Sequence, residues 1–242
     1  MIKIKNLSLN FDEKIIFDNV EFDIPDKKLT FLIGANGMGK TTLFKILANN
    51  ISVPRAEIYS SFKKIFFLPQ KIKYPEKLTL YEYVTSLFFG NSFKWFLSKE
   101  DVNKTNNILE LLELSDRKNI MIEQLSSGEL QKANIAMALL SEADCLLLDE
   151  PTSNMDLINQ IKILDIIKKL NEKGITSVII MHDINTAAQY GDYFFGINQK
   201  HKVICGQKNV FYTADNLSDI FGINFIVNHC GNDINIKMPK DM

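Results

Sequence analysis

The sequence predicts an α/β fold with a mostly parallel core sheet. Short apolar runs typical of buried strands recur along the chain, at 29–33, 64–68, 145–149 and 177–181. Stretches with helical periodicity lie among them, at 40–49, 130–140 and 157–172. Strand, helix and strand in succession imply parallel pairing through right-handed crossovers. Alternating apolar and polar residues predict further, antiparallel strands near the N-terminus, at 2–9 and 20–24, with a loop around 12–14.

The chain reads as one domain with an inserted helical subdomain. Residues 1–70 and 125–242 carry the α/β pattern, whereas 71–124 is rich in aromatic residues and helical in period, notably through 107–114. From residue 193 onward the pattern predicts short strands, a hairpin through 200–206 and a helix near 217–221. We therefore expect a helical subdomain at 71–124 within an otherwise continuous core.

Composition narrows the class of protein. The 242 residues are 46% hydrophobic and 24% charged, with a net charge of −1, as expected of a soluble globular protein with a substantial core. This balance argues against a nucleic-acid binder that works through a basic surface. The cysteines are far apart, which favours a reducing cytoplasm. The sequence offers neither a signal peptide nor an apolar run long enough to span a membrane.

A phosphate-binding loop follows the first buried strand. Residues 34–41, GANGMGKT, match the pattern G-x-x-x-x-G-K-[S/T] between a strand and a helix. Glycines let the backbone wrap around the phosphates, Lys40 adds a positive charge, and the Thr41 hydroxyl coordinates Mg²⁺. The residues expected to bind the nucleotide here are Asn36, Gly37, Gly39, Lys40, Thr41 and Thr42.

Two carboxylates end the apolar strand 145–149. Asp149 and Glu150 are expected at the carboxyl edge of the parallel sheet, where such sheets bind ligands. Asp149 is predicted to hold Mg²⁺, directly or through water. Glu150 is predicted to orient the attacking water and to act as its general base, as phosphoryl transfer to water requires.

A second candidate anion site lies at residues 125–131, LSSGELQ, where a helix is expected to begin near Ser126 and Gly128. With LLLDEP following at 146–151, the chain resembles an ABC ATPase over nearly its whole length. Further motifs that match this family are Gln70 in FFLPQ, SNMD at 153–156, His182 in IIMHD, and Phe11 after the first strand.

The resemblance implies a role for each of these residues. Gln70 reaches toward Mg²⁺ and the attacking water, His182 contacts the γ-phosphate, and Phe11 stacks on adenine. Two chains pack head to tail around two ATP molecules, so that Ser126 and Gly128 bind the γ-phosphate of ATP held by the other copy. ATP with Mg²⁺ would then join a homodimer, and hydrolysis would release it.

The sequence departs from the family pattern in two places. The signature reads S-S-G-E where S-G-G-Q is common, so Glu129 adds negative charge beside the anion site and predicts slow turnover. The segment from Lys40 to Gln70 is short, and the antiparallel hairpin usual there is expected to be trimmed near 51–61.

Segments 78–90 and 182–195 resemble the ATPases of bacterial importers of iron–siderophore, haem and cobalamin. This resemblance implies integral membrane permease subunits as partners, a substrate-binding protein reached through them, and a peripheral position on the cytoplasmic face of the membrane. Phe88, Phe89 and Trp95 are candidates for lining the groove that receives the permease. A soluble ATPase of iron–sulphur cluster assembly and the ATPase of an exporter remain alternatives.

Overall fold

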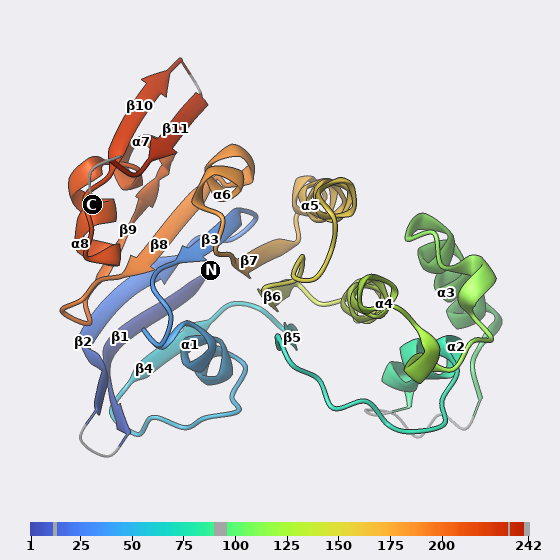
Figure 1. Ribbon diagram of the computed structural model, residues 1–242. Helices are drawn as coiled ribbons and strands as arrows, with labels where there is room; N and C mark the ends of the chain where they lie inside the picture. Colours follow the sequence, from blue (N-terminus) through green and yellow to red (C-terminus); the bar gives the residue numbers. More distant parts are fainter. Residues whose placement is uncertain (12–13, 90–95, 232, 240–242) are drawn as a thin grey trace.

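The computed structural model describes residues 1–11, 14–89, 96–231 and 233–239, and its centre is a sheet in the order β5-β6-β7-β3-β8-β9 (Figure 1). The bounds of these strands are β3 Leu29–Ile33, β5 Ile65–Leu68, β6 Cys145–Asp149, β7 Thr176–Ile180, β8 Tyr193–Ile197 and β9 Val203–Gln207. The pairs from β5 to β8 are parallel, and β9 returns antiparallel to β8. The predicted mostly parallel sheet is confirmed.

A second, antiparallel sheet forms from the N-terminal half in the order β2-β1-β4. Its strands are β1 Ile2–Phe11, β2 Lys14–Ile24 and β4 Glu57–Ser60. Both N-terminal strands are longer than predicted, because register shifts in the β1–β2 ladder let pairing continue where the alternation of the sequence breaks. Lys14, expected in a loop, pairs with Phe11. Of the hairpin expected to be trimmed, the described chain keeps β4, paired with β1.

Hydrophobic cores cover both faces of the central sheet. Alternate residues of one strand enter different cores: Phe31 belongs to one cluster and Leu32 to the other. The first cluster includes residues of α4 (Ser127–Leu140), α5 (Leu157–Glu172), α6 (Ile184–Tyr190) and α8 (Ala214–Phe221). The second includes residues of β1, β2 and α1 (Lys40–Leu47). The central sheet is thereby held between helices on one side and the N-terminal elements on the other.

The helices of the segment 71–124 pack on α4 rather than on the sheet. They are α2 (Leu80–Thr85) and α3 (Lys99–Leu111). The 3-10 turn η1 (Ser86–Phe88) follows α2, η2 (Ser115–Arg117) follows α3, and η3 (Ile122–Gln124) precedes α4. Both contact α4, and Figure 1 shows them beyond α4 from the strands. The predicted helical stretch 107–114 was wrong at its end, because Glu113 takes a φ of 58° that terminates the helix. Trp95 lies outside the described residues, Phe88 is half-buried, and Phe89 is 41% exposed.

The C-terminal part adds a hairpin against α6. The predicted hairpin through 200–206 is the β8–β9 pair, and α7 (Lys208–Phe211) and α8 follow it. The strands β10 (Ile226–Cys230) and β11 (Asp233–Lys237) then form a separate antiparallel pair, which projects from the body in Figure 1. The backbone of Ile236 exchanges hydrogen bonds of 3.0 and 3.3 Å with the Asn185 side chain on α6. Across the described ranges, no helix is both long and apolar enough to cross a membrane.

Candidate functional site

The loop between β3 and α1 is shaped by its glycines, above all by Gly39. All residues of β3 are buried, and the chain turns immediately after it into α1, which begins at Lys40. Gly39 caps this helix with a φ of 87°, in the left-handed region that favours glycine. A Cβ atom there would lie 2.5 Å from Cγ2 of Ile16 and 3.2 Å from Cζ of Phe17. The packing of β2 against the loop therefore requires glycine at this position.

Lys40 is held inside its own loop. Its ammonium group donates hydrogen bonds to the carbonyl oxygens of Gly34, at 2.7 Å, and Ala35, at 2.8 Å. Burial lowers the pKa of the Lys40 ammonium, and the negative charges of Glu150 and Asp149 oppose this shift. The loop thus presents a positive charge whose position is fixed before any anion arrives.

Thr41 and Asp149 form a pair of oxygen ligands at the end of β6. The Thr41 hydroxyl donates to Oδ2 of Asp149 at 2.7 Å, and Asp149 is 1% exposed. Burial raises the pKa of the Asp149 carboxyl, while the Thr41 hydrogen bond lowers it. A hydroxyl and a carboxylate in a buried position suit Mg²⁺, whose charge would offset the cost of burying Asp149. No cluster of three or more His, Cys, Asp or Glu residues fit for a metal occurs in the described chain.

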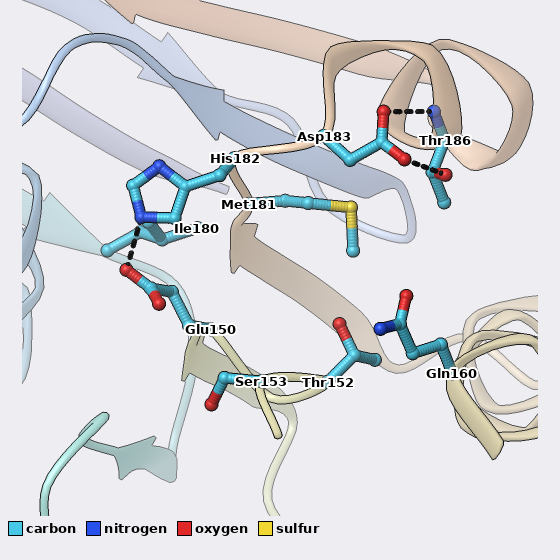
Figure 2. A pocket seen from close by; sticks show the side chains of 9 residues that line it. All are labelled: Glu150, Thr152, Ser153, Gln160, Ile180, Met181, His182, Asp183 and Thr186. Carbon is cyan, nitrogen blue, oxygen red and sulfur yellow. Dashed lines mark hydrogen bonds and ion pairs between the residues drawn. The ribbon is translucent and has the colours of Figure 1, made fainter. Parts of the chain in front are cut away.

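Glu150 accepts hydrogen bonds on both carboxylate oxygens. Gln70 Nε2 donates to Oε2 at 2.6 Å. His182 Nε2 lies 2.6 Å from Oε1 (Figure 2). An ionised carboxylate has no proton, so His182 must carry its hydrogen on Nε2 for this contact. Each oxygen keeps a second lone pair, which leaves Glu150 able to accept a proton from a bound water. The backbone of Glu150 is held at a φ of 51°, which is uncommon for a residue with a side chain.

A cavity of about 290 Å³ connects these groups. Its lining includes the residues that the sequence predicted in this region: Asn36, Gly37, Gly39, Lys40, Thr41, Thr42, Gln70, Asp149 and Glu150. Ile16 and Ile180 complete the lining and were not predicted, because an apolar residue in a strand gives no signal of a ligand. A neighbouring pocket of about 190 Å³ shares Glu150 and is lined by His182, Ser153 and Gln160 among others (Figure 2).

Ser126 and Gly128 are at the start of α4 and line neither of these cavities in the described chain. Ser126 caps the helix, and its side chain and the Glu129 side chain each bond the other's backbone N–H. Gly128 has room for a side chain, since a Cβ atom would lie 4.0 Å from the Asn154 carbonyl oxygen, its nearest neighbour among the described residues outside its own helix backbone. The backbone of Phe11 ends β1, and its side chain lies outside the described part of the structure.

A buried polar network that the sequence did not predict connects α4 with α2 and with the strand end at Glu150. The Tyr83 hydroxyl donates to Asn134 Oδ1 at 2.8 Å, and Asn134 Nδ2 donates to the Tyr74 hydroxyl at 3.0 Å. One turn earlier on α4, Gln131 Nε2 donates to the carbonyl oxygen of Pro151 at 2.9 Å. The helix that begins at Ser126 is therefore tied both to α2 and to the residue after Glu150.

Comparison with known proteins agrees with this geometry. The family model described as ABC transporter matches residues 17–153. The probable siderophore transport system ATP-binding protein YusV of Bacillus subtilis is 33% identical, over 92% of this chain and 86% of its own length. The petrobactin import ATP-binding protein YclP of the same organism is 31% identical, over 91% of this chain and 92% of its own length.

Solved structures agree on the fold. An inward-facing structure described as a metal-chelate type ABC transporter matches with a TM-score of 0.84 at 24% identity, covering 98% of this chain and 96% of the other. A dimeric bacterial ABC transporter cassette matches with a TM-score of 0.76 at 28% identity, covering 86% of this chain and 99% of the other. With a family model over more than half of its residues and relatives above 30% identity along most of its length, the chain belongs to the ABC transporter family, as one of the ATP-binding subunits that hydrolyse ATP to power transport.

Proposed function

We propose that two copies of this chain bind two ATP molecules between them and hydrolyse them beneath a membrane permease. In each copy the loop 34–41 and Lys40 hold the β- and γ-phosphates, and Phe11 stacks on the adenine. The observation that carries the proposal is the Glu150 carboxylate, held by Gln70 and His182 beside the Thr41–Asp149 pair in one cavity. The proposed base, positive charge and cation site would then surround one cavity that receives the phosphates.

The reaction follows from the positions of these groups. Lys40 stabilises charge that develops on the phosphate oxygens, and Gln70 and His182 fix the direction of the Glu150 carboxylate. A water between Glu150 and the γ-phosphate would lose its proton to the carboxylate as it attacks phosphorus. The bond from the γ-phosphorus to the β–γ bridging oxygen breaks, and ADP and inorganic phosphate leave. Thr41, Asp149 and Gln70 would hold Mg²⁺, which supplies charge neutralisation to the phosphates when bound.

The proposed role of Ser126 and Gly128 in the second copy's site is supported by the absence of a structural requirement for glycine at position 128 within the described chain. Among the described residues of its own chain none crowds a side chain there, and its backbone φ is not in the left-handed region. Glycine inside a helix destabilises it by roughly 1 kcal/mol relative to alanine. A glycine that neither packing nor backbone requires fits a close approach by another molecule, here the ATP of the facing copy. The dimeric cassette similar to this chain has the required stoichiometry.

The transport direction and cargo follow from the relatives. YusV is named for siderophore transport and YclP for petrobactin import, and we infer that this chain likewise powers import of an iron chelate. The permease would dock on the subdomain 71–124, where Phe89 is exposed, and would connect to an extracellular substrate-binding protein. The subunit itself would lie on the cytoplasmic face of the membrane.

The proposal is tested by Glu150→Gln. This variant keeps the size of the side chain and its oxygen acceptor but loses the base, so it should bind ATP, hydrolyse it at least about 100-fold more slowly and accumulate as a dimer with ATP and Mg²⁺. Turnover and gel filtration measure these effects. Asp165→Asn changes an exposed carboxylate in the middle of α5 that lines neither cavity, and the amide oxygen can still accept the hydrogen bond from Tyr190. It is the control and should behave as wild type. Turnover near the wild-type rate in Glu150→Gln would exclude the base role.

A further inference from the structure

The serine proposed to meet the facing copy's ATP is already engaged by a carboxylate of its own helix. Oε2 of Glu129 accepts from the Ser126 backbone N–H at 2.9 Å and from the Ser126 hydroxyl at 2.8 Å. The same hydroxyl oxygen accepts the Glu129 N–H at 3.3 Å. The proton that Ser126 would donate to a phosphate is therefore directed at Glu129.

The other oxygen of this carboxylate is held from outside the helix. Arg117, the last residue of η2, donates from Nε to Oε1 of Glu129 at 2.8 Å. The hydrogen bonds from Ser126, and to a lesser degree Arg117, lower the pKa of the Glu129 carboxyl, so this group is ionised at neutral pH. A full negative charge thus lies within the first turn of the helix, where an incoming phosphate is expected.

An ionised carboxylate at this position opposes phosphate binding in two ways. It competes for the Ser126 hydroxyl, and its charge repels the γ-phosphate. The Arg117 guanidinium on the other carboxylate oxygen removes the repulsion, because its positive charge makes the pair neutral as a whole.

Folding stability is a poor explanation for this pair. The side chain of Arg117 is 54% exposed and that of Glu129 is 27% exposed. Ion pairs so accessible to water contribute little to stability. The electrostatic effect on a polyanion that arrives at the same helix end is larger, since contact between two copies excludes water there.

We propose that Arg117 is the positioning residue that makes the S-S-G-E signature competent, by neutralising Glu129 and leaving Ser126 able to turn toward the γ-phosphate of ATP bound by the second copy. This inference rests on the proposed function, in which two copies share each nucleotide. It assigns to the segment 71–124, through η2, a direct influence on the strength of the ATP-dependent dimer.

The test measures the dimer dissociation constant by analytical ultracentrifugation with ATP and Mg²⁺, in a Glu150→Gln background that prevents turnover. Arg117→Gln should weaken the dimer by about tenfold or more, because two symmetric sites each lose a neutralising charge. Glu129→Gln should tighten it, since a glutamine oxygen can still cap the helix without charge. The double variant Arg117→Gln/Glu129→Gln should match Glu129→Gln alone, because Arg117 then has no charge to neutralise.

Controls separate the proposed role of Arg117 from the proposed ATP-dependent dimer on which it rests. Arg55→Gln removes the same charge from an exposed position before β4 and should leave the dimer unchanged. Arg117→Gln should also unfold at the same temperature as its parent, which shows that the fold is intact. If the Glu150→Gln parent forms no ATP-dependent dimer at all, both proposals fail. If the dimer forms but Arg117→Gln equals the Arg55→Gln control, or weakens association equally with and without Glu129, the proposed role of Arg117 alone is wrong.

Discussion

The substitution Asn134→Leu tests the buried network that joins α4 to α2. Asn134 is 2% exposed and Tyr83 is 5% exposed, and the leucine side chain has the same branching and number of heavy atoms as that of asparagine. The change therefore removes the acceptor of the Tyr83 hydroxyl without opening a cavity. A buried hydroxyl left without a partner costs about 1–3 kcal/mol. Tyr74 is half-buried, so the loss of the Asn134 donor to its hydroxyl destabilises the protein less, because water can reach the side chain.

We expect a loss of about 2–4 kcal/mol in the free energy of unfolding, corresponding to a fall in Tm of about 5–10 °C for a chain of this size. Urea unfolding at 25 °C measures the loss. Adding Tyr83→Phe to Asn134→Leu should recover a large part of it, because both partners are then apolar. Asn106→Leu, on the exposed face of α3, is the matched control and should stay within about 0.5 kcal/mol of wild type. A small loss in Asn134→Leu, or no recovery in the double variant, would refute the energetic role of the network.

Two further predictions concern the nucleotide cavity. Because burial raises the pKa of Asp149 above its ordinary value of 3.8, the ionised group opposes folding at neutral pH. Ligand-free Asp149→Asn should therefore have a higher Tm than wild type at pH 7, and the gap should close as the pH falls toward 3.8; a gap that is absent at pH 7 would contradict this. Gly39→Ala should cost about 2–4 kcal/mol through backbone strain and the clash with Ile16. Gly174 also has a positive φ, of 94°, but no atom lies within 4 Å of an added Cβ, so Gly174→Ala should show a distinctly smaller loss of stability in thermal unfolding. Equal losses for the two substitutions would mean that the clash with Ile16 contributes nothing.

The elements that surround the site could be predicted because their signals are local. The strands 29–33 and 145–149 agree with β3 and β6 at both ends, since each is a wholly buried apolar run. The helix 157–172 agrees with α5, which Asp156 caps. The carboxyl ends of parallel strands share one edge, so Asp149, Glu150 and the phosphate loop were correctly expected to meet.

Other features depend on contacts that a pattern does not contain. The helix start expected near Ser126 and Gly128 is confirmed at Ser127, but its reciprocal cap between Ser126 and Glu129 was not predicted. Asn134 alone looks like a polar interruption of an apolar helix, and its partners lie 60 and 51 residues away. Arg117 was missed for the same reason. The β10–β11 pair is short and partly exposed, so its alternation predicted strands without their pairing.

The left-handed backbone of Glu150 has a consequence for how this position can change. A residue with a side chain held at a φ of 51° costs roughly 1 kcal/mol. Glycine would remove the penalty and asparagine would reduce it, and neither can accept the proton of the attacking water. Substitutions at position 150 that stabilise the fold would therefore inactivate the subunit. Selection for transport must retain glutamate in spite of its strained backbone.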